Sequence, residues 1–313
     1  MILSDMNHSQ IRTGKVLKVT RKTYTVEVNG RKIPCVVRGK LADDSSDYGA
    51  VRVGDDVRVR LISGQEGTIE EILPRRSQFS RVIESRAYSE RVVAVNIDQI
   101  LIVMSTRQPK FSSGLLDRYL VLAARNEMNA VICLNKIDLE PPESFSAYRK
   151  YYHRLGFPFL LTSAITGQGV KELKKYLKDK VTAMAGHSGV GKSSLAGRLQ
   201  PGLDIAIHRI SERTQKGQHT TTSVELFPLT FGGYLADTPG IRELGLWKIY
   251  KRDLQEYFIE FRDYREDCRF ADCRHLKEPG CAVKSAVERR DIFPERYQNY
   301  VRIYESLKSA HYE

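Results

Sequence analysis

Short stretches in which apolar and polar residues alternate fill the N-terminal part of the chain. In order, they read GKVLKV, TYTVEV, KIPCVV, DDVRVRLI and GTIEEIL. Alternation with a period of two is typical of strands with one buried face, and turn signals such as Asn29-Gly30 separate the stretches. Five short strands predict a small closed barrel over residues 1–76, OB-like (oligonucleotide-binding) or SH3-like. Such a barrel also serves as a spacer or protein-docking module.

A second pattern begins after LPRRSQFSR at 73–81, which is predicted to be a linker. Apolar runs then alternate with helical patterns, from DQILIVMS and SGLLDRYLVLAAR through AVICLN and FPFLLTS to VKELKKYLK and VTAMAG. Strands that alternate with helices indicate a central α/β domain on a parallel sheet, predicted for residues 77–242. Residues 243–313 are mostly helical and charged in pattern, and predict a third, small α-helical domain.

A phosphate-binding loop is predicted at the end of the run VTAMA. Residues 186–193, GHSGVGKS, match the pattern G-x-x-x-x-G-K-[ST] in full, and a helical stretch follows. Glycines let backbone N–H groups turn toward phosphates, Lys192 would reach the β- and γ-phosphates, and the Ser193 hydroxyl would bind Mg²⁺. The predicted contacts are Gly186, His187, Ser188, Gly189, Val190, Gly191, Lys192, Ser193 and Ser194.

Two further phosphate elements follow this loop. Asp237-Thr-Pro-Gly240 comes after the strand-like YLA, so Asp237 would hold Mg²⁺ through water and the Gly240 N–H would sense the γ-phosphate. Between the two lies a basic loop that ends in three threonines. We expect Thr221 to bind Mg²⁺, and Thr220 and Thr222 remain alternatives.

The sequence NKID follows the apolar run AVICL and predicts guanine recognition. The carboxylate of Asp138 can accept hydrogen bonds from N1–H and N2–H₂ of guanine, a pair that adenine does not offer. Asn135 would steady the pocket, and the stem of Lys136 would cover the base and the ribose. The predicted base contacts are Asn135, Lys136, Ile137 and Asp138, together with Thr162, Ser163 and Ala164.

The order of these motifs is unusual. Thr162-Ser163-Ala164 follows the strand-like FPFLL, where a loop amide usually contacts guanine O6. Both base-binding elements precede the phosphate loop, whereas ordinary GTPases place them after it. The order therefore predicts a circularly permuted P-loop GTPase domain, with new ends at the surface of one compact domain.

A cluster of cysteines predicts a metal site in the C-terminal domain. Cys268, Cys273, His275 and Cys281 offer three thiolates and one imidazole within a short segment. This set fills the tetrahedral shell of a structural Zn²⁺ ion and leaves no open position. Pro279-Gly280 would supply the turn that brings Cys281 back to the cluster.

Composition points to a compartment and to a partner. The five cysteines fit a reducing compartment, and the N-terminus lacks a signal-peptide pattern, so we expect a cytoplasmic protein. No apolar run is long enough to span a membrane. The net charge of +12 suggests a polyanionic partner, although a basic surface also serves solubility. A monomer is the default expectation.

The permuted order and the motifs GHSGVGKSSL, KGQHTTT, DTPGIREL and EPGCAV resemble the ribosome small-subunit-dependent GTPase A family. The resemblance covers essentially the whole chain. It implies a cytoplasmic GTPase that converts GTP to GDP and phosphate with Mg²⁺, binds ribosomal RNA, is stimulated by the small ribosomal subunit and acts late in the assembly of that subunit.

The position after Gly240 departs from ordinary small GTPases, which carry a water-orienting glutamine there. Ile241 cannot orient water, so another group must serve, and the resemblance favours His219. The expected catalytic residues are therefore His219, Lys192 and Thr221. Two alternatives stay open: a P-loop kinase or ATPase with an accessory RNA domain, and a nonenzymatic RNA-binding factor that uses GTP only as a structural ligand.

Overall fold

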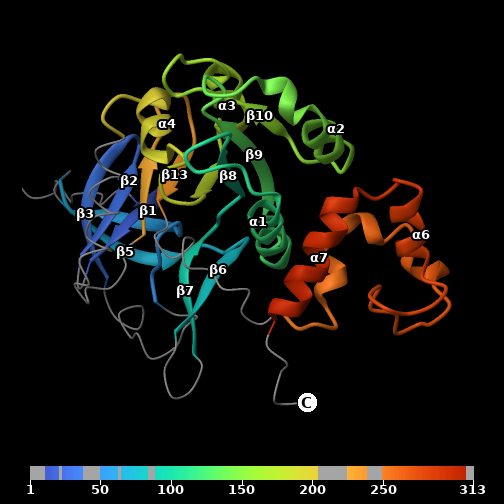
Figure 1. Ribbon diagram of the computed structural model, residues 1–313. Coiled ribbons are helices and arrows are strands. Elements are labelled where there is room, and N and C mark those ends of the chain that lie inside the picture. The colour runs from blue at the N-terminus through green and yellow to red at the C-terminus, as the bar shows by residue number, and fades with distance from the viewer. Residues whose placement is uncertain are drawn as a thin grey trace, which may run out of the picture. The chain divides into compact units, whose positions relative to one another are not determined.

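The computed structural model describes residues 11–20, 23–37, 50–62, 65–83, 89–203, 224–237 and 249–307, with only the backbone described for residues 80–83, 89–91 and 237. The chain forms two compact units. Figure 1 labels their helices and strands. The first draws on Met1–Asp98, Leu177–Ala183 and Arg209–Gly240. The second draws on Gln99–Tyr176, Met184–His208 and Ile241–Glu313.

The N-terminal strands close into a five-stranded barrel, which confirms the OB-like prediction. The strands are β1 (Ile11–Val19), β2 (Tyr24–Val28), β3 (Arg31–Val37), β4 (Asp56–Leu61) and β5 (Gly67–Ile72). Their order is β1-β2-β3-β5-β4, and β4 pairs back to β1. Only the β3–β5 pair is parallel among these described ladders. The inward side chains, such as Val57 and Val59, are fully buried, and the intervening Arg58 is exposed.

The predicted linker is wrong over its second half. Gln78–Ile83 is strand β6, and it pairs with β7 (Ser89–Val95) in an antiparallel ladder that aligns Phe79 with Ala94. Its apolar residues, Phe79, Val82 and Ile83, do not alternate strictly with polar ones, so the pattern did not reveal a strand. Pairing with β7 and the burial of Phe79 stabilise it. In the same unit, β12 (Glu225–Pro228) pairs with β13 (Tyr234–Asp237) and with β1.

The second unit contains three parallel strands, β8 (Gln99–Ser105), β9 (Asn129–Asn135) and β10 (Phe159–Leu161). All seven residues of β8 are buried, as expected for a parallel strand covered on both faces. The helices are α1 (Ser113–Arg125), the 3-10 turn η2 (Pro142–Phe145), α2 (Ser146–Arg154), α3 (Val170–Leu177) and α4 (Lys192–Leu199). Strand β11 (Val181–Ala185) leads into the predicted phosphate loop.

The C-terminal segment is helical, but its first half consists of short 3-10 turns. These are η4 (Leu254–Tyr257), η5 (Ile259–Phe261) and η6 (Arg265–Asp267), followed by α6 (Ala282–Glu288) and α7 (Pro294–Ser306). Phe258, Phe261 and Tyr300 form an aromatic core with ring centroids 4.9–5.4 Å apart. Val121 of α1 belongs to the same core cluster, so this segment packs on the α/β part of its own unit.

A buried ionic network also joins α7 to α1. The guanidinium of Arg296, 1% exposed, donates to Asp117 of α1 at 2.5 Å and to Glu260 of η5 at 2.5 Å. Asp117 also accepts from Tyr152 at 2.6 Å and from Asn299 at 2.8 Å. Burial raises the pKa of Asp117, and the hydrogen bonds and the Arg296 charge oppose that shift.

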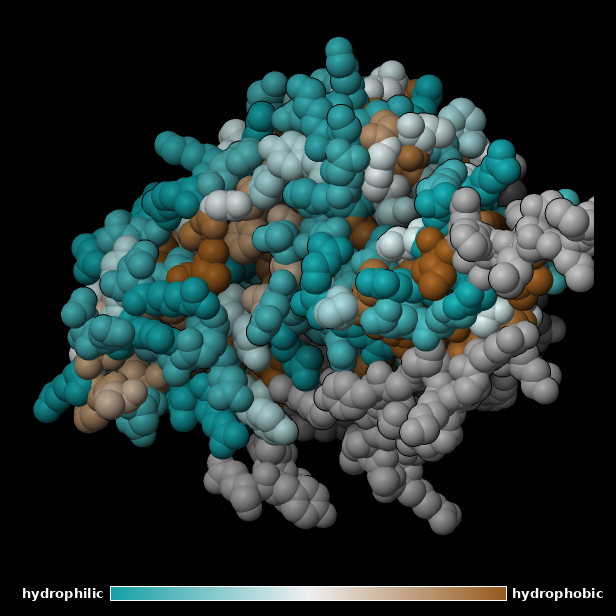
Figure 2. Space-filling model, turned by 180° about the vertical axis from the view of Figure 1, so that it is seen from behind, coloured by the Kyte–Doolittle hydropathy of each residue, from teal (hydrophilic) through white to brown (hydrophobic). Residues whose placement is uncertain are grey.

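The described surface is predominantly hydrophilic on the face drawn in Figure 2, where hydrophobic side chains occur in scattered patches. Within the described residues, no helix is both long enough and apolar enough to cross a membrane. The predicted boundaries 1–76, 77–242 and 243–313 stay a prediction.

Candidate functional site

The side chain of Asn135 joins the two base-binding motifs to the phosphate loop. It lies at the carboxyl end of β9 and is 1% exposed. Its Nδ2 donates to the Val190 carbonyl at 2.9 Å, and its Oδ1 accepts from the Ala164 amide at 3.1 Å. The Thr162 hydroxyl donates to the same Oδ1 at 3.3 Å. The structure therefore brings together three motifs that are separated in sequence.

This contact explains one glycine of the phosphate loop. A Cβ atom at Gly191 would lie 2.4 Å from Nδ2 of Asn135, and the backbone φ of Gly191 is +95°. Both the space and the left-handed backbone exclude a larger residue. Gly191 also immediately precedes α4, so its conformation sets the direction in which that helix leaves the loop.

Asp138 is exposed beside the buried Ser163, whose hydroxyl donates to Oδ1 of Asp138 at 2.5 Å. This bond orients the carboxylate, and within the described residues Oδ2 of Asp138 has no protein donor. Ile137 is buried and anchors the turn. Because the Ala164 amide donates to Asn135 here, its contact with guanine O6 stays a prediction.

Lys136 adopts a left-handed backbone with φ of 64°. Its carbonyl accepts from the Thr106 hydroxyl at 2.6 Å, and its Nζ donates to the Gln108 carbonyl at 2.5 Å. Thr106 and Gln108 lie in the segment after β8, and no sequence motif marks them as site residues. They hold Lys136 in the turn between β9 and the following helices.

The phosphate loop connects β11 to α4. His187, Ser188 and Gly189 are exposed, as a loop that receives an anion requires. Lys192 is 7% exposed, and its ammonium group donates to the carbonyls of Gly186 and His187, both at 2.7 Å. Ser193 and Ser194 lie in the first turn of α4.

Arg198, in the last turn of α4, is a site residue that was not predicted from the sequence. Its Nε donates to the Ala164 carbonyl at 2.6 Å, and its Nη2 donates to the Ile165 carbonyl. One side chain on the phosphate-loop helix therefore fixes the backbone of the base loop. The only sequence signal is an arginine two turns after Lys192, and helical spacing alone does not identify its partner.

Several predicted residues are not placed by the structure. His219, Thr221 and Gly240 lie outside the described residues, as do the alternatives Thr220 and Thr222. Asp237 is the last residue of β13, and its side chain is not described. The roles assigned to these residues stay predictions.

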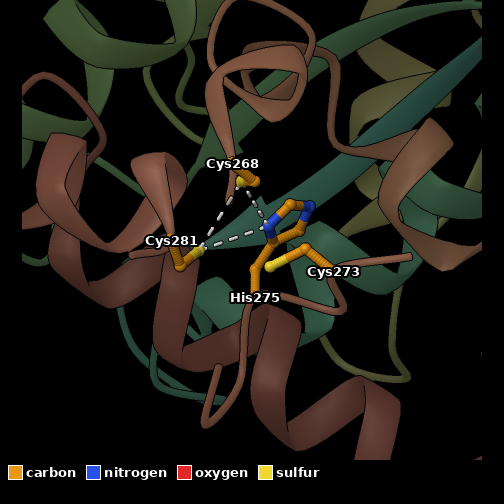
Figure 3. Close-up of side chains that lie close together, drawn as sticks. All are labelled: Cys268, Cys273, His275 and Cys281. Atoms are coloured by element: carbon orange, nitrogen blue, oxygen red, sulfur yellow. Dashed lines mark hydrogen bonds between the residues drawn. The ribbon is translucent and has the colours of Figure 1, made fainter. Parts of the chain in front are cut away.

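The four predicted metal ligands converge, as Figure 3 shows. The ligand atoms of Cys268, Cys273, His275 and Cys281 all lie within 4.8 Å of one another. Nδ1 of His275 faces the sulfurs of Cys281 and Cys268, at 3.4 and 3.6 Å. Its Nε2 lies 2.8 Å from Oε1 of Gln255. That oxygen can only accept, so Nε2 carries the proton and Nδ1 keeps a lone pair for a metal ion.

The electrostatics of the cluster favour a cation. Burial raises the pKa of Cys273 to about 12 and lowers the pKa of His275 to about 4. A neutral imidazole is ready to bind a metal, whereas the buried thiols of Cys273 and Cys281 ionise only if a positive charge compensates them. The donor set and its spacing therefore fit a metal ion held by four protein ligands.

Comparisons with known proteins agree with this geometry. The model of the RsgA GTPase family matches residues 72–247. The small ribosomal subunit biogenesis GTPase RsgA of Gemmatimonas aurantiaca is 40% identical over 298 residues, which cover 94% of this chain and 97% of that protein. The crystal structure of YjeQ from Thermotoga maritima matches with a TM-score of 0.77 and 36% identity, over 95% of this chain and 99% of that chain. The crystal structure of YloQ, described as a circularly permuted GTPase, matches with a TM-score of 0.75 and 31% identity, over 97% of both chains.

Replacing Arg198 by alanine removes the two bonds that fix the base loop. We expect the dissociation constants of GDP and of a GTP analogue to rise by the same factor, roughly 3- to 10-fold. Equal factors are expected because both nucleotides share the base. Arg198→Lys keeps a charged donor group at this position, so its nucleotide affinity should fall less than that of Arg198→Ala. Titration of a fluorescent nucleotide measures both constants, and unchanged constants for Arg198→Ala would contradict the role.

Proposed function

The chain belongs to the RsgA GTPase family, and from that premise we propose that it hydrolyses GTP to GDP and phosphate in the biogenesis of the small ribosomal subunit. The observation that carries this proposal is the position of Asn135, which bonds to the base loop and to the phosphate loop with one side chain. A nucleotide bound along this side chain would have its base at Asp138 and its phosphates at Lys192.

We propose the following roles for the residues of the nucleotide site. Asp138 accepts from N1–H and N2–H₂ of guanine, and Ser163 keeps the carboxylate in place. Lys192 exchanges its two loop carbonyls for phosphate oxygens, because a charged acceptor binds an ammonium group more strongly than a carbonyl does. Ser193 and Thr221 would hold Mg²⁺, with Asp237 bound to it through water, and the ion would neutralise charge that develops on the phosphates.

The second component is the partner. The relatives are named as GTPases of small ribosomal subunit biogenesis. We propose that the small subunit and its ribosomal RNA bind this chain and stimulate its turnover, in the cytoplasm and with the chain as a monomer. The net charge of +12 supports a polyanionic partner.

The third component is the metal. We propose Zn²⁺ at Cys268, Cys273, His275 and Cys281, because thiolate and imidazole donors in a closed set of four suit this ion. Four protein ligands leave no open position, so the ion is structural. The role of the metal is to hold the 3-10 turns and α6 together in a segment with a small core.

The proposed activity is tested by measuring hydrolysis of GTP and of ATP, with and without purified small ribosomal subunits, at fixed salt. We expect the subunits to stimulate GTP hydrolysis and to leave ATP hydrolysis at background. Equal use of ATP would favour the kinase or ATPase alternative. Tight GTP binding without turnover, even with subunits, would favour the nonenzymatic alternative.

Asp138→Asn sharpens this test, since an amide can donate to the C2 carbonyl of xanthine but cannot accept both guanine donors. We expect this variant to lose GTP affinity by roughly 100-fold and to bind xanthosine triphosphate instead.

His219→Ala tests the residue expected to orient water. Because Ile241 offers no polar group, we expect this variant to bind GTP normally while its subunit-stimulated turnover falls by roughly 100-fold or more. Single-turnover rates with saturating subunits measure the effect, and His219→Gln is a conservative comparison. Stimulated turnover that stays at the wild-type rate would remove His219 from the mechanism.

Cys273→Ser tests the metal centre. We expect the wild-type protein to contain one zinc ion per chain by elemental analysis, and the variant to lose it. Loss of the ion should lower the thermal unfolding midpoint by about 5–10 °C, because the remaining ligand groups lose their common partner. Cys35→Ala is the matched control, since Cys35 is a buried thiol of the barrel and should leave the zinc content unchanged. A zinc-free wild-type protein would refute the assignment.

A further inference from the structure

Helix α2 presents a basic surface with no acidic residue in its own sequence, SAYRKYYHR. Its inner face is aromatic: Tyr151 and Tyr152 are buried, and Tyr148 is half-buried. Its exposed arc carries Arg149, Lys150, His153 and Arg154. Cations near a helix C-terminus complement the helix dipole, which accounts for His153 and Arg154. Arg149 and Lys150 lie earlier in the helix, so that explanation does not extend to them.

This surface continues onto the turn between α6 and α7. Nη2 of Arg154 donates to the Asp291 carbonyl at 2.5 Å, which joins the end of α2 to that turn. The rings of Tyr151 and Phe293 are 5.2 Å apart, and those of Tyr148 and Phe293 are 5.6 Å apart. These contacts lie within one compact unit, so α2 and the first turn of α7 form one continuous surface.

A recess opens at the start of α7. It has a volume of about 480 Å³ and is lined by Arg290, Phe293, Pro294, Glu295, Gln298 and Arg302. This volume lies within the range of sites that hold one small organic group. Phe293 supplies an aromatic wall, and the exposed Gln298 supplies an amide that can both donate and accept.

The cations of the recess are available to a ligand. Arg290 and Arg302 are exposed, and within the described ranges neither has a carboxylate partner. The acid of the recess, Glu295, accepts hydrogen bonds from the hydroxyls of Ser113 and Tyr148. Asp291 is paired with Arg289 at 3.1 Å. Apart from Asp291 and Glu295, the acids nearest in sequence to the recess are the exposed Glu288 and Glu305.

We propose that the exposed face of α2 and the recess at the start of α7 together bind RNA. The phosphates lie on Arg149, Lys150 and their neighbours, and one unstacked nucleotide enters the recess beside Phe293. Guanidinium groups match phosphate oxygens in geometry, and single-stranded bases bind to aromatic and guanidinium planes. The proposal rests on the proposed function, because that function supplies a ribosomal RNA partner.

The experiment compares full-length wild-type protein with the double variant Arg149→Gln/Lys150→Gln. Binding to purified small subunits and to their protein-free RNA is measured at four salt concentrations, in the presence of a non-hydrolysable GTP analogue. Loss of two phosphate contacts should weaken binding by roughly 3- to 10-fold and reduce the slope of log K against log salt by about 1.4–1.8. Arg302→Gln, at the recess, should also weaken binding to the small subunits and to their protein-free RNA.

The matched control is Lys171→Gln/Lys175→Gln on α3, which removes the same charge from two other exposed positions of the same unit. The proposal predicts that this control loses less binding affinity than Arg149→Gln/Lys150→Gln and keeps the wild-type salt slope. Unfolding midpoints of all variants establish that the fold is retained. Equal losses of affinity in both double variants would show that only net charge matters and would overturn the proposal. Unchanged affinity in both variants would also overturn it.

Two other outcomes distinguish failure of the RNA surface from failure of the proposed ribosomal partner. A loss with whole subunits but none with protein-free RNA would assign the surface to a ribosomal protein and overturn the RNA proposal. Wild-type protein that binds neither subunits nor RNA would refute the partner in the proposed function and would overturn the surface proposal with it.

Discussion

The organisation of the nucleotide site depends on the carboxamide of Asn135. It is buried at the end of one strand and bonds to loops that follow two other strands. An amide can donate and accept at once, so it can satisfy backbone groups of opposite polarity in a space that excludes water. Gly191 leaves that space open, and Arg198 also bonds to the backbone of the base loop.

The same constraint explains why a permuted chain can keep a working site. The contacts of Asn135 require that strand ends meet at one edge of a sheet, and they do not require any order of the strands along the chain. Moving the chain ends to the surface preserves every one of these contacts. In this unit β9 and β10 are parallel neighbours, so the loops after them start side by side.

The sequence predicted the elements whose patterns are local. The barrel strands and α1 follow from alternation and from helical periodicity, and the metal cluster follows from ligand type and spacing. The hairpin at Gln78–Ile83 and the role of Arg198 were missed, because both depend on partners far along the chain. The hydrogen bond of the Ala164 amide to Asn135 was missed for the same reason. A strand stabilised by its partner, or an arginine that binds a carbonyl, leaves no periodic signal.

The buried guanidinium of Arg296 has a consequence for dissecting the chain. A fragment that ends before the C-terminal segment would leave the carboxylate of Asp117 buried without its cation, and Val121 would lose its apolar neighbours. The α/β part and the C-terminal segment are therefore interdependent in folding, although a sequence boundary separates them. A truncated GTPase fragment is a poor surrogate for the whole, and any rotation of α7 must carry α1 with it.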